Sequence, residues 1–166
     1  MQKQQKKTLW ICYAAIIAAM YVVLTYVAKL FGLDSGMIQV RFSEVLCILP
    51  IFTSAAIPGL AIGCLLANLL GSAVILDVVF GPIATLIGAL GTYLLRKHKW
   101  IAPLPPILAN ALIIPFVLAY GYGMTEAIPF MMLTVGIGEI ISIYVLGMAF
   151  YFALEKRARS IFGKIE

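Results

Sequence analysis

Six polar side chains stand inside otherwise apolar stretches of this sequence, where they could bind a polar ligand. An ionisable group at membrane depth costs about 2.5–3.5 kcal/mol on insertion scales, so a chain that keeps one usually uses it. Carboxylates accept hydrogen bonds from cationic or N–H-rich ligands, amides donate and accept, and a guanidinium donates. We therefore expect a substrate-binding site built from Arg41, Glu44, Asn68, Asp77, Asn110 and Glu139.

Five of these residues also have a purely structural interpretation. Arg41 and Glu44 are three residues apart, so they could share a helix face and pair with each other. Asn68 and Asn110 could join helices through hydrogen bonds. Asp77 could cap the start of a helix.

Glu139 is the strongest candidate for ligand binding. It lies near the middle of a long apolar stretch, and no basic residue stands within eight positions of it. A carboxylate in such surroundings needs a partner, a proton or a cationic ligand.

The composition indicates the elements that position these residues. Hydrophobic residues make up 63% of the 166 residues and charged residues only 11%, whereas soluble domains are about 25% charged. The chain has room for about six spans of about 20 residues. We predict an all-α integral membrane protein, a single domain over residues 1–166 that forms a compact bundle of six transmembrane helices. The predicted spans are residues 9–31, 42–55, 57–71, 76–95, 105–120 and 128–154.

Basic residues indicate the orientation. Ten of the twelve lie in the two terminal segments and in the 96–99 loop, which six spans place on one side. The positive-inside rule puts that side, with both termini, in the cytoplasm. Most acidic residues then lie at the outer face or in the outer half, among them Asp34, Glu44, Asp77, Glu126 and Glu139. This placement accounts for the net charge of +5 without a nucleic-acid partner.

Several signatures of other functions are missing from the sequence. There is no Gly-rich phosphate loop ending in Gly-Lys and no His-Glu-x-x-His zinc motif. The single histidine, His98, lies in a basic loop, and Cys12, Cys47 and Cys64 are spread through apolar runs. We therefore expect no enzyme activity, no catalytic residues, no cofactor and no metal site.

Small residues at four-residue spacing predict close helix packing. On the third and fourth spans, they are Gly59, Gly63, Ala67 and Gly71, then Gly81, Ala84, Gly88 and Gly91. On the first span, they are Ala14, Ala15, Ala18 and Ala19. We interpret the first two sets as intramolecular packing, whereas the alanine face of the first span could pack internally or receive a partner helix.

The sequence resembles a family of membrane transporters. The segments that carry the resemblance are QVRFSE at 39–44, LP at 49–50, AIPGL at 56–60, IGC at 62–64, ANL at 67–69 and DVVFG at 77–81. They resemble the QueT family, the queuosine-precursor transporters that serve as substrate-binding (S) components of energy-coupling factor (ECF) importers. The resemblance is strongest over residues 38–81 and weak from residue 101 onward.

The resemblance implies partners and a location. It implies a multi-pass protein of a bacterial plasma membrane that works with one transmembrane coupling protein and two cytoplasmic ATPases. ATP hydrolysis would belong to those partners. The alanine face that docks on the coupling protein in such importers corresponds here to Ala14 and Ala18, with Ala15 and Ala19 beside it.

The implied substrate is a queuosine precursor, 7-aminomethyl-7-deazaguanine. Its guanine edge and its cationic aminomethyl group both suit carboxylates, and its carbonyl suits an amide or Arg41. Tyr120 and Tyr122 could stack on the base or serve as interface residues. Which carboxylate binds which end of the substrate stays open at this point.

Two other functions also fit the sequence. One is an S component for another vitamin, such as riboflavin or thiamine, with the same fold and a different site. The other is a stand-alone proton- or ion-coupled carrier that uses Glu139.

Overall fold

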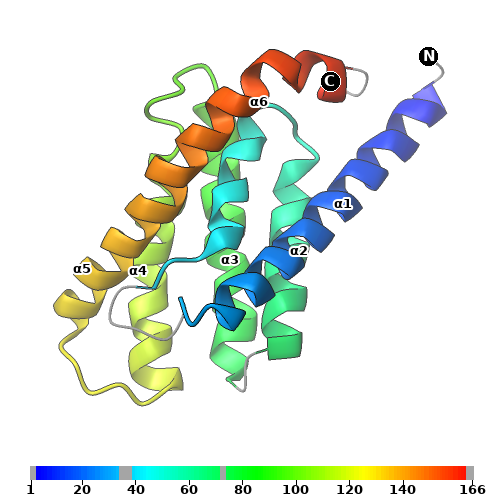
Figure 1. The fold of residues 1–166 in the computed structure, drawn as a ribbon. Coiled ribbons are helices and arrows are strands. Elements are labelled where there is room, and N and C mark those ends of the chain that lie inside the picture. Colours follow the sequence, from blue (N-terminus) through cyan, green and yellow to red (C-terminus); the bar gives the residue numbers. More distant parts are fainter. Residues whose placement is uncertain (1–2, 34–38, 72–73, 164–166) are drawn as a thin grey trace.

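The computed structural model describes residues 3–33, 39–71 and 74–163, and all regular structure in these ranges is helical (Figure 1). In chain order the helices are α1 (Lys3–Leu30), η1 (Phe42–Ile51), α2 (Ala56–Gly71), α3 (Ile75–Leu94), α4 (Leu104–Gly121), α5 (Ile128–Glu139), η2 (Ile140–Leu146) and α6 (Gly147–Phe162). Two of them are irregular, because η1 is a 3-10 helix and η2 is a π-helix. The predicted all-α class is confirmed.

Four of the described helices are long and apolar enough to cross a membrane. They are α1, α3, α4 and the continuous helix formed by α5, η2 and α6, in which the apolar stretch covers Ile128–Ala158. The apolar helices η1 and α2 are shorter. At about 2.0 Å per residue in a 3-10 helix and about 1.5 Å in an α-helix, neither reaches the roughly 30 Å of a hydrocarbon core. The six-span count therefore stays a prediction.

Most helix boundaries agree with the prediction to within one or two residues, and three differ. Helix α1 begins at Lys3, several residues before the predicted start of the first span. The last helix continues to Phe162 instead of ending near residue 154. Helix η1 ends at Ile51, next to Pro50, which has no backbone N–H to donate.

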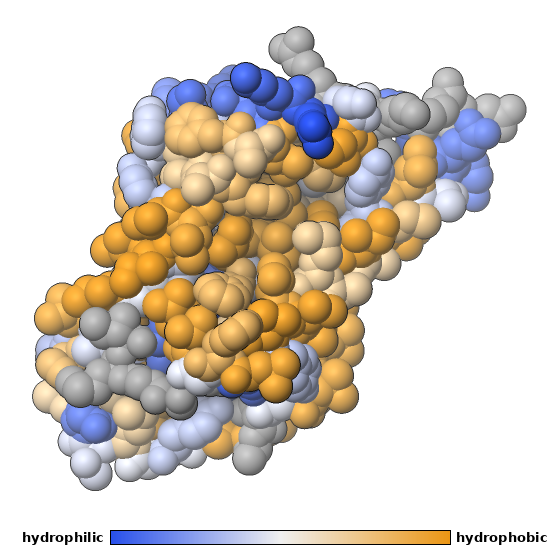
Figure 2. Space-filling view, viewed as in Figure 1, coloured by the Kyte–Doolittle hydropathy of each residue, from blue (hydrophilic) through white to orange (hydrophobic). Residues whose placement is uncertain are grey.

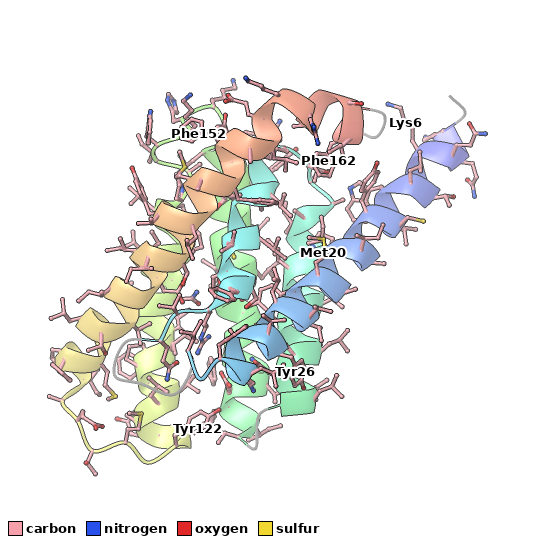
Figure 3. The ribbon with its side chains drawn as sticks, in the orientation of Figure 1. Lys6, Met20, Tyr26, Tyr122, Phe152 and Phe162 are labelled. Carbon is pink, nitrogen blue, oxygen red and sulfur yellow. The ribbon has the colours of Figure 1, made fainter. Side chains whose placement is uncertain are left out.

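Both termini lie at the same end of the molecule (Figure 1). The α3–α4 connection contacts α6 near this end. The Lys99 Nζ lies 5.3 Å from the centre of the Phe152 ring, and the centres of the Trp100 and Phe152 rings are 5.9 Å apart. Figure 2 shows hydrophilic residues gathered at the end with the termini and apolar surface over the middle of the molecule. We call this end the basic end. Tyr26 and Tyr122 mark the opposite end (Figure 3).

The glycines of α2 bring its backbone against α1. A Cβ added at Gly59 would lie 2.8 Å from the carbonyl oxygen of Ala14, and one at Gly63 would lie 2.9 Å from that of Ala18. Such contact needs the absence of a side chain, which confirms intramolecular packing for this set of small residues. On α3, Gly88 and Gly91 bring the backbone against Pro106 and Pro105 of α4, whereas Gly81 faces Asn68 of α2.

This packing divides the predicted docking face of α1. Ala14 and Ala18 are buried beneath α2, so they are not available to a partner helix as the prediction placed them. Ala15 and Ala19 are exposed on the neighbouring face. Only the second pair could form an accessible docking surface.

Helix η1 lies in the interior, in contact with α1, α2, α3, η2 and α6. Its middle residues Leu46, Cys47 and Ile48 are almost completely buried. Ser43 and Glu44, at its beginning, are also buried. The fold therefore carries polar side chains into the bundle at the start of this helix.

Candidate ligand-binding site

A cavity of about 460 Å³ opens near the end opposite the basic end. Its lining comes from α1, the 39–43 segment, α2, α3, α4 and the residues just after α4. The lining carries charged side chains, Lys29, Arg41 and Asp77, among apolar and aromatic ones. Small-molecule sites usually enclose about 300–1,000 Å³ and combine an apolar lining with a few polar groups. The cavity has both properties.

Arg41 is part of this lining and lies on extended backbone just before η1 (φ −102°, ψ 107°). Its backbone N–H donates to the Ser142 hydroxyl at 3.1 Å, and that hydroxyl donates to the Gly138 carbonyl at 2.9 Å. Its guanidinium interacts electrostatically with Glu139 and Glu44. Arg41 thus connects the cavity to the α5–η2 junction.

Glu44 accepts hydrogen bonds from two neighbours, and its interaction with Arg41 is electrostatic, without a shared helix face. Its Oε1 accepts a 2.6 Å hydrogen bond from the Tyr21 hydroxyl, and its Oε2 accepts a 3.0 Å bond from the Cys47 thiol. The predicted shared face does not form, because Arg41 precedes the helix. Glu44 is buried and does not line the cavity.

Glu139 and Asn110 form a buried pair that does not line the cavity. They are only 4% and 2% exposed, and the Asn110 side chain interacts with the Glu139 carboxylate. The Oε2 of Glu139 and the Nδ2 of Asn110 nevertheless have no hydrogen-bond partner. A buried polar group left unpaired costs about 1–3 kcal/mol, and such groups are rare enough to need an explanation.

The backbone next to Glu139 is also unusual. Glu139 ends α5, and the chain continues directly into the π-helical turn η2. Single π-turns inside α-helices occur frequently at functional sites. At the preceding position, a Cβ on Gly138 would collide with the backbone carbonyl oxygen of Gln39. The 39–41 segment therefore lies directly on the junction that carries Glu139.

Asn68 and Asp77 lie in the cavity lining on α2 and α3. The Asn68 amide donates to the Asp77 backbone carbonyl at 2.9 Å, which joins the two helices. The Asp77 carboxylate accepts a 3.1 Å bond from the Tyr122 hydroxyl. Asp77 does not cap α3, because the N-cap residue is Val74. Asn68 thus has the structural role that the sequence allowed, while the Asp77 carboxylate faces the cavity.

Comparison with known proteins adds the family. The family model described as QueT transporter matches residues 11–156. The chain belongs to the QueT family. A relative from Lactococcus lactis subsp. cremoris (strain MG1363), the queuosine precursor transporter QueT, is 37% identical over 97 residues, which are 58% of this chain and 57% of the relative. The match thus covers less than two thirds of the relative's length. No solved structure matches the chain.

In this QueT family member the six predicted site residues form two layers. Arg41, Asn68 and Asp77 line the cavity, whereas the other three lie deeper and do not line it. The deeper layer is Glu44, Asn110 and Glu139. The two aromatic candidates also separate, because Tyr122 lines the cavity and Tyr120 is 73% exposed outside it.

The sequence-based prediction missed several residues of this QueT site. Tyr21 and Lys29 line the cavity from α1, and Gln39 and Ser142 hold the segment around Arg41. The spacing of three residues between Glu139 and Ser142 was a usable signal, since helical residues at that spacing are neighbours. Tyr21 offered no comparable signal, because a tyrosine in an apolar helix is common.

Proposed function

We propose that this chain is the membrane-embedded substrate-capturing component of an importer for a queuosine precursor, 7-aminomethyl-7-deazaguanine. One observation carries the proposal: within a family of transporters, this chain holds a cavity of small-molecule size that is lined by charged side chains. Charged groups between apolar helices are costly, and substrate pathways are where they are usually kept.

The chemistry of the cavity suits this substrate. The aminomethyl group is cationic, and the Asp77 carboxylate in the lining offers it a counter-charge. The ring carbonyl is an acceptor, which Arg41 or the unpaired amide of Asn110 can satisfy. Tyr122 in the lining provides an aromatic face for the base.

We propose a six-span topology with both termini in the cytoplasm of a bacterium. The clustering of lysine and arginine at the basic end supports this orientation. The cavity then opens toward the outside, where an importer meets its substrate. In this topology η1 and α2 are short spans; η1 is enclosed by the other helices, whereas α2 packs on α1 and α3 and exposes an apolar face.

We also propose that transport depends on partners, namely a transmembrane coupling protein and two cytoplasmic ATPases of an ECF importer. The missing phosphate loop in this sequence is consistent with ATP hydrolysis on other chains. The exposed face around Ala15 and Ala19 is the proposed docking surface for the coupling protein. Small residues there allow close approach of a partner helix.

Mass spectrometry of the compound that co-purifies with the protein, followed by calorimetric titration, tests the proposed function. We expect 7-aminomethyl-7-deazaguanine in the pocket and saturable binding by the purified protein. Recovery of riboflavin or thiamine would indicate an S component for another vitamin. Uptake that follows a proton gradient, with no ATPases in the purified complex, would indicate a stand-alone carrier.

A further inference from the structure

Two unpaired atoms in the deeper layer define the ligand edge that could satisfy them. The Asn110 Nδ2 is a hydrogen-bond donor without an acceptor, and the Glu139 Oε2 is an acceptor without a donor. The Asn110 side chain lies close enough to influence the Glu139 carboxylate, but no hydrogen bond of ordinary length and angle joins these two atoms. A ligand edge that carries a carbonyl beside an N–H, as a cyclic amide does, can pair with both atoms at once.

We infer that Asn110 and Glu139 bind the 2-amino-4-oxopyrimidine edge of the substrate. In this arrangement the Asn110 amide donates to the ring carbonyl, and the Glu139 carboxylate accepts from the ring N–H and the exocyclic amino group. The inference rests on the proposed function and assigns the orientation of the substrate within that site. The edge is shared by guanine and its deaza analogues.

The other two carboxylates are less suited to this edge. Both oxygens of Glu44 already accept a hydrogen bond, from Tyr21 and from Cys47. Asp77 lies in the cavity lining beside Tyr122, at the end of the molecule that Tyr122 marks. The aminomethyl group of a substrate held by Glu139 therefore points toward Asp77, which supplies the counter-charge.

The deeper layer is connected to the cavity. Ile114 lines the cavity, and Asn110 lies one turn earlier on the same side of α4. Arg41 lines the cavity as well, and its charge interacts with Glu139. The ring reaches the pair when the long Arg41 side chain moves aside, while its backbone stays bound to Ser142.

A cycle of protein variants against ligand analogues tests this orientation. The ligands are 7-aminomethyl-7-deazaguanine, its analogue without the 2-amino group, and 7-deazaguanine, which lacks the aminomethyl group. The proteins are the wild type, Glu139→Gln and Asp77→Asn, each titrated by calorimetry in detergent. Groups in direct contact give non-additive effects, whereas distant groups give additive ones.

We expect Glu139→Gln to weaken binding of the full substrate by about tenfold or more, since it breaks a desolvated charged contact. Removal of the ligand's 2-amino group should weaken binding to the wild type by a similar factor. In Glu139→Gln the same removal should weaken binding by less than about a further threefold. Removal of the ligand's aminomethyl group should weaken binding to the wild type and to Glu139→Gln by the same factor. The same removal should change the affinity of Asp77→Asn little.

The opposite coupling pattern would overturn the inference. If loss of the aminomethyl group were the change that no longer matters in Glu139→Gln, then Glu139 would bind the amine and the orientation would be reversed. Should Glu139→Gln fail to fold, Asn110→Ala gives a second measurement: it should weaken binding of all three ligands, which share the ring carbonyl, but should bind a further analogue that lacks this carbonyl as the wild type does. A wild-type protein that binds none of the three ligands would overturn the proposed function and this inference together.

Discussion

Gly138 is the position where the smallest substitution should disturb the site most. A Cβ there would collide with the backbone carbonyl oxygen of Gln39 and would lie 3.1 Å from the Gln39 carbonyl carbon. The obstacle is backbone, so the 39–41 segment itself has to move. Arg41 is bound to the same junction through Ser142, and Gly138→Ala therefore displaces Arg41 as well.

The cost of this substitution can be translated into affinity. Overpacking a close contact costs about 1–3 kcal/mol, and about 1.4 kcal/mol corresponds to tenfold in affinity. The ligand-free protein can relax by releasing the 39–41 segment, whereas the bound state needs the Arg41 backbone to stay bound to Ser142. Gly138→Ala should therefore weaken substrate binding by between about fivefold and about 150-fold.

Gly136→Ala is the matched control on the same helix. A Cβ at Gly136 would meet only the Cβ of Ala111, at an ordinary 3.7 Å. Both substitutions replace a helical glycine by alanine, which favours the helix by roughly 0.5–1 kcal/mol in each case. Calorimetric titration should show wild-type affinity for Gly136→Ala. Equal affinities for the two variants, with equal thermal stability, would refute the role assigned to the 39–41 contact.

Three further predictions concern other parts of the molecule. Ala19→Leu should keep substrate binding but lose uptake in cells, because the added volume blocks the proposed docking surface. Ala18→Leu should also lower the melting temperature, because Ala18 is packed beneath α2. In a cysteine-free background, a cysteine at Gly123 should react with an impermeant label on intact cells and one at Lys97 should not; labelling at Lys97 would contradict the six-span topology. Tyr21→Phe removes the hydroxyl donor of a buried carboxylate oxygen and should destabilise the protein by about 1–3 kcal/mol in thermal unfolding, and an unchanged melting temperature would show that this hydrogen bond contributes little.

Asp34, which the sequence places at the outer face, lies outside the described residues. The outer face is therefore tested through Gly123, which lies just after α4. Its positive φ of 68° favours glycine, so a cysteine introduced there is strained but meets no neighbouring atom within 4 Å.

The helices themselves could be predicted well from the sequence. Apolar runs bounded by proline, glycine or charge set most ends, as Pro105 does near the start of α4. The last helix extends beyond its apolar run: residues 155–162 are helical but not hydrophobic throughout, so hydrophobicity alone did not predict this end. The 3-10 form of η1 was not predicted, since nothing in its apolar sequence distinguishes it from an α-helix.

The members of the candidate site could be predicted, but their partners could not. Glu139 stood out because a carboxylate is rare in an apolar run, and this signal does not depend on the fold. The Tyr21–Glu44 bond and the Asn110–Glu139 pair join residues from separate helices. Which face of α1 stays exposed was equally undetermined, because alanines occupy two neighbouring faces and the glycines of α2 decide which one is covered.

The two irregular helices meet where the polar residues gather. Helix η1 begins directly after Arg41, η2 begins directly after Glu139, and the two helices are in contact. Long 3-10 runs and π-turns have poorer hydrogen-bond geometry than α-helices. In an apolar environment, irregular backbone is tolerated only where it is buried in protein or lines a cavity. Ser43 of η1 lines the cavity and η2 packs against η1, so the backbone supports the same location for the site as the unpaired side chains.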